Sequence, residues 1–388
     1  MTRTMEQLAL FGAEAAFPTP LHVAQLYLPA FDKVETAFRG ILARRYFTNN
    51  GPLVREFEER LSEVLGIPHV IAMTNGTVAL MAMAKAFCNV GEVIVPTFTF
   101  PATVQALSWA GLTPVLCDVD PLTHMLTPEL VAPLLTARSE AILGVHLWGA
   151  PCAPEALSTL AVKSGVKLLF DACHGMGCMW NARPLAAFGD AAALSFHATK
   201  IVSAAEGGCV VTHDDAVADT LREIRTFYSA NTATPVARMN GRMSEAQAAF
   251  GLLSLEDMPA NIAANRARYD VFRKGLAGLP GISLLPLADG NNFQYIVLEI
   301  DEDMCGLSRD QLLLLLKAEN VFCRRHFFPG IHQLRPYASE RSFPNAERLC
   351  GRLLQLPSGE PVTAAAAGRI CELLADMVSL APGIKARA

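Results

Sequence analysis

The sequence predicts an α/β protein with a seven-stranded, mostly parallel central sheet covered by helices, followed by a smaller C-terminal α+β domain. Between about residues 54 and 215, seven short apolar runs alternate with helical patterns, which is typical of parallel strands joined by helices. After Pro280 the pattern resumes with a strand at residues 293–300 and a helix at 309–319. We therefore expect a large domain over residues 1–255 and a small domain over residues 256–388.

The seven apolar runs cover residues 69–73, 93–95, 114–117, 141–145, 167–170, 192–196 and 209–211. Helical periodicity then extends from Gly241 to about Gly278, and its charged stretch from Asn265 to Lys274 predicts a long exposed helix that joins the two domains. Sheets of this kind bind ligands at the carboxyl ends of their strands. The residues that follow each run are therefore the candidates for a functional site.

Composition excludes several classes of function. The chain has 388 residues, of which 52% are hydrophobic and 18% charged. The charged fraction is below the usual value of about 25%, which indicates extensive burial or an oligomer interface. A net charge of -5 gives no basic surface for nucleic acid. The N-terminus lacks the apolar core of a signal peptide and no apolar run reaches about 18 residues, so we expect a soluble, cytoplasmic protein without membrane contact.

The ten cysteines are scattered, and none forms a CxxC pair. Several lie within the apolar runs. This pattern predicts buried free thiols, with neither a disulfide framework nor a metal site.

Lys200 follows the sixth apolar run and precedes the glycine pair at 207–208. A lysine held near a buried sheet edge loses solvation, so its neutral, nucleophilic amine is easier to reach, and Schiff-base chemistry needs that amine. A solvated lysine at the end of a strand is the commoner reading of a lone lysine. Other residues have to decide between the two.

Three other strand ends, and Ser195 in the run before Lys200, carry residues that suit one ligand. Thr74-Asn75-Gly76-Thr77 precedes a helix, whose free N–H groups would bind a phosphate or would simply be capped. Asp171 would face a pyridinium nitrogen or cap the next helix. The remaining candidates are His174, Phe100 as a stacking ring and Ser195 as a phosphate donor. Each signal is weak alone, but their shared place at successive strand ends indicates a cofactor site.

These residues belong to motifs that resemble the DegT/DnrJ/EryC1/StrS family of sugar aminotransferases. The resemblance runs from about Thr48 to Pro357. Its motifs are Thr74-Asn75-Gly76-Thr77-Val78-Ala79-Leu80, Pro96-Thr97-Phe98-Thr99-Phe100, Asp171-Ala172-Cys173-His174, Ser195-Phe196-His197-Ala198-Thr199-Lys200 and Arg242-Met243-Ser244-Glu245. The family implies the fold of type I, aspartate-aminotransferase-like enzymes and the cofactor pyridoxal 5'-phosphate, which becomes pyridoxamine 5'-phosphate during turnover.

The resemblance also implies a role for each residue. Lys200 and Asp171 would be catalytic, Lys200 as the Schiff-base lysine and Asp171 as the partner of the pyridine nitrogen. His174 would lie near the phenolic oxygen of the cofactor and Phe100 on its ring. The phosphate would be held by Gly76, Thr77, Ser195 and an Asn240 from the neighbouring subunit. The resemblance therefore implies a homodimer that shares its active sites.

The implied reaction moves an amino group from L-glutamate to the keto carbon of a nucleotide-linked deoxysugar. The His-Ala-Thr-Lys form of the lysine motif resembles members that act at C4 more than members that act at C3, which often have a Tyr-Pro-x-Lys form. A dTDP-4-keto-6-deoxyhexose, such as dTDP-4-keto-6-deoxyglucose, is therefore the expected substrate. Arg242, Arg324 and His332 are candidates to bind it, although a surface ion pair is the commoner role of a single arginine.

Two segments depart from the family pattern. Asn240-Gly241-Arg242-Met243 stands where the family has Asn-Tyr-Arg-Met, and Phe328-Pro329-Gly330-Ile331-His332 stands where it has Tyr-Pro-Pro-Leu-His. The alternatives are an aminotransferase for a C3-keto-sugar or a non-sugar ketone, and a non-catalytic regulatory protein that binds the cofactor. Retention of Lys200 disfavours a dehydratase, and Lys200 together with Asp171 disfavours the regulatory protein.

Overall fold

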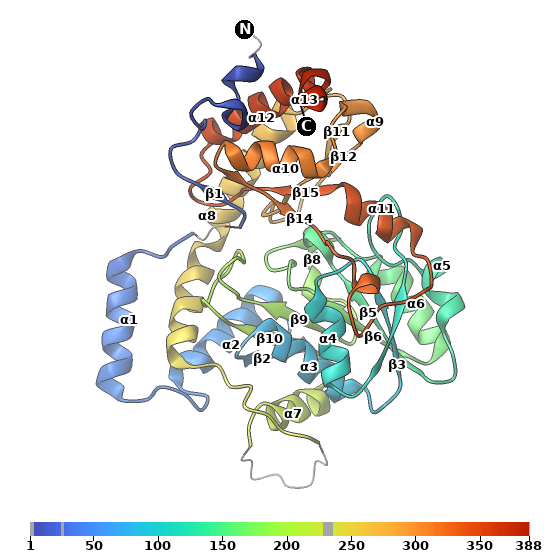
Figure 1. The fold of residues 1–388 in the computed structure, drawn as a ribbon. Coiled ribbons are helices and arrows are strands. Elements are labelled where there is room, and N and C mark those ends of the chain that lie inside the picture. The colour runs from blue at the N-terminus through green and yellow to red at the C-terminus, as the bar shows by residue number, and fades with distance from the viewer. Residues whose placement is uncertain (1–3, 25–26, 228–235, 388) are drawn as a thin grey trace.

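The structure, a computed structural model, describes residues 4–24, 27–227 and 236–387. It has two halves (Figure 1). The larger half is built on a seven-stranded sheet with helices on both faces, and the C-terminal half is built on a four-stranded sheet. Within the described ranges, no helix has the length and apolar character needed to cross a membrane.

The central sheet has the strand order β2-β10-β9-β6-β5-β3-β4. Its strands are β2 (His69–Met73), β3 (Glu92–Pro96), β4 (Thr113–Cys117), β5 (Ser139–Val145), β6 (Lys167–Asp171), β9 (Ala191–Ser195) and β10 (Gly208–Thr212). Neighbouring strands are parallel, except that β10 is antiparallel to both β2 and β9. The seven apolar runs correspond to these seven strands, which confirms the predicted fold class.

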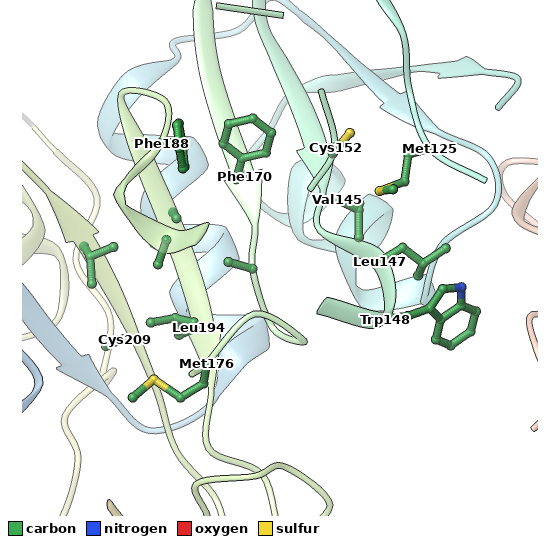
Figure 2. Close-up of a cluster of buried hydrophobic side chains, with 14 of the residues drawn as sticks. Met125, Val145, Leu147, Trp148, Cys152, Phe170, Met176, Phe188, Leu194 and Cys209 are labelled. Carbon is green, nitrogen blue, oxygen red and sulfur yellow. The ribbon is translucent and has the colours of Figure 1, made fainter. Parts of the chain in front are cut away.

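Successive residues of each strand enter two different cores, because side chains alternate across a sheet. In β6, Leu168 and Phe170 belong to the core on one face and Leu169 to the core on the other. Figure 2 shows Phe170 within the first core, together with Leu147 and Trp148, which follow β5. Both faces of the sheet are covered, so its strands appear in the sequence as apolar runs without polar alternation.

Different helices cover the two faces of the sheet. Helices α2 (Pro52–Leu65), α5 (Pro128–Val131) and α6 (Pro154–Ser164) cover the first face, and α3 (Gly76–Phe87), α4 (Pro101–Trp109) and α7 (Asp215–Ile224) cover the second. Proline in the first turn favours the start of α2, α4, α5 and α6. The connections contain η3 (Ala132–Leu134), η4 (Leu147–Gly149), β7 (Met179–Trp180), β8 (Arg183–Pro184) and η5 (Leu185–Ala187).

The C-terminal half has an antiparallel sheet of β11 (Ile282–Leu284), β12 (Ile296–Ile300), β15 (Leu353–Leu356) and β14 (Arg324–Arg325), in that order. Helices α10 (Arg309–Ala318) and α12 (Ala364–Ser379) enclose its core. Its other elements are α9 (Glu302–Cys305), β13 (Val321–Phe322), η6 (Ile331–Gln333), α11 (Pro344–Arg352) and α13 (Ala381–Arg387). The strand and helix predicted after Pro280 are both present, as β12 and α10.

Helix α8 (Glu245–Gly275) connects the two halves (Figure 1). Its N-terminus is fixed by a capping box between Ser244 and Gln247. It packs on α2 in the larger half and on α12 in the C-terminal half, and α1 (Phe31–Arg44) lies along it. The predicted domain boundary after residue 255 falls within α8, and the division into two domains stays a prediction.

The N-terminal segment lies against the C-terminal half. It contains η1 (Met5–Gln7), η2 (Ala9–Phe11) and β1 (Leu21–His22), and β1 pairs in parallel with β13. All ten cysteines fall within the described residues and are free thiols, and all except Cys173 and Cys323 are buried. The expectation of buried free thiols is met at eight of the ten positions.

Candidate active site

A cavity of about 510 Å³ lies where the carboxyl ends of the central strands face the C-terminal half. The strand-end wall carries most of the residues that the sequence predicted for a site: Gly76, Thr77, Phe100, Asp171, His174, Ser195 and Lys200. The opposite wall, which we call the C-terminal wall, consists of Tyr295, Arg324, His326, Phe327 and Gln355. The cavity therefore takes residues from both halves of the chain.

The N-terminus of α3 forms one end of the cavity. The Asn75 side chain caps the helix by accepting the Val78 N–H at 2.9 Å, which leaves the first N–H groups of the helix for a ligand. A Cβ at Gly76 would lie 2.9 Å from the Cβ of Ser195, so only glycine lets the helix approach the end of β9 this closely. A helix N-terminus beside a serine hydroxyl suits a phosphate group.

Asp171 ends β6 and is 6% exposed. Its carboxylate accepts the Thr103 hydroxyl at 2.8 Å and the Cys173 N–H at 3.0 Å. The described residues offer it no cation within ion-pair distance, although a buried carboxylate is costly without one. A ligand with a protonated ring nitrogen would supply the missing positive charge.

His174 offers a single hydrogen-bond donor to the cavity. Its Nδ1 accepts the Trp148 N–H at 3.3 Å, so the ring proton is on Nε2. Burial, together with the positive charge of Lys200, holds the pKa of His174 well below its ordinary value. The imidazole is therefore neutral at pH 7, and its Nε2–H suits a ligand oxygen.

Lys200 Nζ donates a hydrogen bond to the Tyr295 hydroxyl at 3.0 Å. Burial by itself lowers the pKa of Lys200, but Tyr295, Cys173 and Asp171 outweigh it and raise the pKa above its ordinary value. Burial thus acts in the expected direction, but the net pKa shift of Lys200 favours the charged amine, opposite to the expected neutral one. The reason is that the sequence argument did not include the polar groups around the amine.

Phe100 caps the N-terminus of α4, and its side chain is 60% exposed at the edge of the cavity. An apolar ring just after a strand is more often packed in the core, but the exposure of Phe100 excludes that role here. An exposed aromatic ring beside a cavity is available to stack on a flat ligand.

Three of the predicted residues do not line the cavity. Asn240 is exposed and accepts a hydrogen bond from Arg242 at 3.0 Å, and Arg242 also contacts Asn49. His332 is buried elsewhere and shares a hydrogen bond with the Thr97 hydroxyl at 3.1 Å. In the described part of a single chain, these side chains are therefore separate from the other predicted site residues.

Sequence reasoning missed Thr103 and four members of the C-terminal wall, namely Tyr295, His326, Phe327 and Gln355. Thr103 lies in the first turn of α4, beside a strand end, and this position was the available signal. Tyr295 and Gln355 stand in or next to apolar runs that have the pattern of ordinary strands. Their place in the site depends on how the C-terminal sheet packs against the larger half.

Comparison with known proteins gives concordant matches. The model of the DegT/DnrJ/EryC1/StrS aminotransferase family matches residues 31–375. The chain is 34% identical to a dTDP-4-amino-4,6-dideoxy-D-glucose transaminase of Shigella dysenteriae, over 87% of this chain and 94% of that protein.

Two solved structures are also similar. DesI, solved in the presence of its TDP-sugar product, has a TM-score of 0.95 and 41% identity over 99% of both chains. DesV of S. venezuelae, solved in complex with a ketimine intermediate, has a TM-score of 0.83 and 28% identity over 89% of this chain and 94% of its own.

Proposed function

The chain belongs to the DegT/DnrJ/EryC1/StrS aminotransferase family, and from this membership we propose that it aminates C4 of a dTDP-linked 4-keto-6-deoxyhexose such as dTDP-4-keto-6-deoxyglucose. L-glutamate is the amino donor and pyridoxal 5'-phosphate is the cofactor. The observation that carries the proposal is the convergence of Lys200, Asp171 and the N-terminus of α3 in one cavity. The similarity to a dTDP-4-amino-4,6-dideoxy-D-glucose transaminase and to DesI, which was solved with its TDP-sugar product, supports a dTDP-sugar as substrate.

The residues of the cavity fit pyridoxal phosphate. The close approach of Gly76 to Ser195 at the start of α3 suits its phosphate, and the buried Asp171 carboxylate suits its protonated ring nitrogen. When bound, this cofactor supplies an aldehyde that bonds to amines and a ring that draws electrons from the reacting carbon.

Each residue of the cavity would have a separate role in the reaction. Lys200 Nζ is the amine that would hold the cofactor covalently and, once released, move the proton of the reacting carbon. Asp171 would keep a proton on the ring nitrogen, and the His174 Nε2–H would bind the phenolic oxygen. Phe100 would cover the ring and exclude water from it. The Tyr295 hydroxyl would hold the released Lys200 amine in place.

We also propose a homodimer that shares its active sites. Asn240 is exposed, and the adjacent Gly241 carbonyl accepts the Thr74 N–H at 2.8 Å, so Asn240 lies beside the strand that leads into α3 but faces outward. The region around α1 exposes several large apolar side chains, which indicate a contact surface: Phe31, Phe38, Leu42, Tyr46 and Phe47. A second copy on this surface would bring its Asn240 to the phosphate site of the first.

The test uses the full chain loaded with pyridoxal phosphate. We expect visible absorbance that borohydride bleaches, that L-glutamate shifts, and that is absent in Lys200→Ala. Lys85→Ala is the matched control because Lys85 lies in the last turn of α3, away from the cavity. Product analysis should then show glutamate-dependent amination of dTDP-4-keto-6-deoxyglucose. Reaction with only a 3-keto isomer would refute C4, and reaction with only small ketones would refute the sugar assignment.

A further inference from the structure

Three polar residues of the C-terminal wall face the cavity together. Arg324 on β14 is paired in register with Gln355 on β15, so their side chains lie next to each other on the same face of the sheet. His326 follows Arg324 by two residues, and all three line the cavity. We call this group the polar triad.

Two members of the triad hold buried polar atoms without partners. Gln355 is 2% exposed, and its Nε2 has no hydrogen-bond partner among the described residues. The same holds for Nδ1 of His326, whose pKa is lowered to about 3 by burial and by the charge of Arg324. Buried polar groups are nearly always hydrogen-bonded, so these two atoms indicate a ligand that completes them.

The third member carries an uncompensated charge. Arg325, its neighbour on β14, forms an ion pair with Asp310 at 3.0 Å and lies over the ring of Phe328. Arg324 has no carboxylate within ion-pair distance in the part of the chain that the structure describes. The two adjacent arginines therefore differ. Arg325 is paired with Asp310, whereas the exposed Arg324 has its positive charge at the cavity.

We propose that the polar triad binds a carboxylate of the amino donor. Arg324 supplies the charge and a planar pair of N–H donors, which matches a carboxylate. Gln355 supplies an amide N–H, and the neutral His326 supplies one donor or acceptor. This inference rests on the proposed function, because it assigns one half of that reaction to the C-terminal wall.

The geometry favours the carboxylate of an amino acid over the diphosphate of a sugar nucleotide. The α-carboxylate is attached directly to the carbon that reacts near Lys200, and the triad lines the same cavity as Lys200. A cavity of about 510 Å³ must also hold the cofactor, so a nucleotide diphosphate would extend toward its mouth. A single guanidinium also balances a carboxylate better than a group with two negative charges.

The two half-reactions separate these possibilities. L-glutamate converts the loaded protein in the first half-reaction. The dTDP-4-amino sugar, which has no carboxylate, converts it through the reverse of the second. Binding is measured separately by calorimetry with α-methyl-L-glutamate, which cannot lose an α-proton. The variants are Arg324→Ala and Gln355→Leu, and Arg325→Ala is the matched control.

We expect Arg324→Ala to weaken the binding of both glutamate compounds by about 10- to 100-fold, as for loss of a charged hydrogen-bonded pair. The half-reaction of this variant with the amino sugar should change by less than about 3-fold, because that sugar has no carboxylate for Arg324 to bind. Gln355→Leu should weaken glutamate binding by about 3- to 10-fold without lowering the melting temperature, because its buried Nε2 has no partner to lose among the described residues. Arg325→Ala should leave both half-reactions within about 3-fold, since its partner is Asp310.

An equal or larger effect of Arg324→Ala on the amino sugar would overturn the inference and assign the triad to the nucleotide sugar, while the proposed function would stand. Unchanged binding of both glutamate compounds would also overturn it. If the loaded wild-type protein responds to no amino donor at all, the proposed function itself fails and the inference fails with it.

Discussion

Replacing Tyr295 by phenylalanine tests the most direct contact of the candidate site. The Tyr295 hydroxyl accepts a hydrogen bond from Lys200 Nζ at 3.0 Å, and Tyr295 is only 5% exposed. The substitution removes this acceptor but keeps the ring, which packs 4.3 Å from the ring of His174 and 5.6 Å from that of Trp148. The packing of the cavity wall should therefore be preserved.

The size of the effect follows from the hydrogen bond. A buried hydrogen bond to a charged group contributes about 1.5–3 kcal/mol, and one pKa unit corresponds to about 1.4 kcal/mol. The bond stabilises the charged form of Lys200, so its loss should lower the pKa of Lys200 by about one to two units.

The assay is the pH dependence of Lys200 acylation in protein freed of cofactor, followed by quantitative peptide mass spectrometry. Tyr269→Phe is the matched control, because Tyr269 is also a buried tyrosine but its hydroxyl donates to the Leu285 carbonyl at 3.0 Å. We expect the control to match the wild type. A pKa of Lys200 that stays the same or rises in Tyr295→Phe would refute the reasoning.

Three further changes test other parts of the structure. Gly76→Ala places a methyl group 2.9 Å from the Cβ of Ser195, so cofactor affinity, measured by absorbance titration, should fall by about 10-fold or more; unchanged affinity would contradict the phosphate site. Thr103→Val removes the hydroxyl that donates to Asp171 and should lower the free energy of unfolding in urea by about 1–3 kcal/mol; a neutral result would mean that water replaces the hydroxyl. Burial lowers the pKa of His146 to about 3, so this neutral histidine stabilises the fold above pH 6.5 and that contribution is lost as the pH falls. Between pH 7 and pH 5 the loss is about 2 kcal/mol, and His146→Gln should remove it from the urea-unfolding difference, whereas the same pH dependence in both proteins would show that His146 is not its source.

The central sheet could be predicted because its strands are buried on both faces. Leu168, Leu169 and Phe170 enter alternate cores, so the middle of β6 is apolar, and the same is true of the middles of β5 and β9. The residues of the strand-end wall could be predicted for a related reason. Parallel strands place their carboxyl ends at one edge, so Asp171 and Lys200 were expected to meet.

The C-terminal wall could not be predicted, because no local sequence pattern indicates which residues of the two halves come into contact. Tyr295 and Lys200 are 95 residues apart, and Tyr295 precedes an apolar strand whose pattern suggests only packing. Gln355 stands within β15 among buried leucines. The net pKa shift of Lys200 was missed for the same reason: burial lowers the pKa as expected, but the sequence did not show that Tyr295 would raise it.

The division of the cavity between two walls has an evolutionary consequence. The strand-end wall carries the residues proposed for the cofactor, whereas the C-terminal wall consists of a few side chains on two short strands and their neighbours. Substitutions at Arg324, His326 or Gln355 can therefore change which substrate the cavity binds without altering the proposed phosphate site at the N-terminus of α3. Exchange of side chains on this wall between relatives is therefore a direct route to engineered specificity, and the same exchange in evolution would give descendants of this fold new substrates.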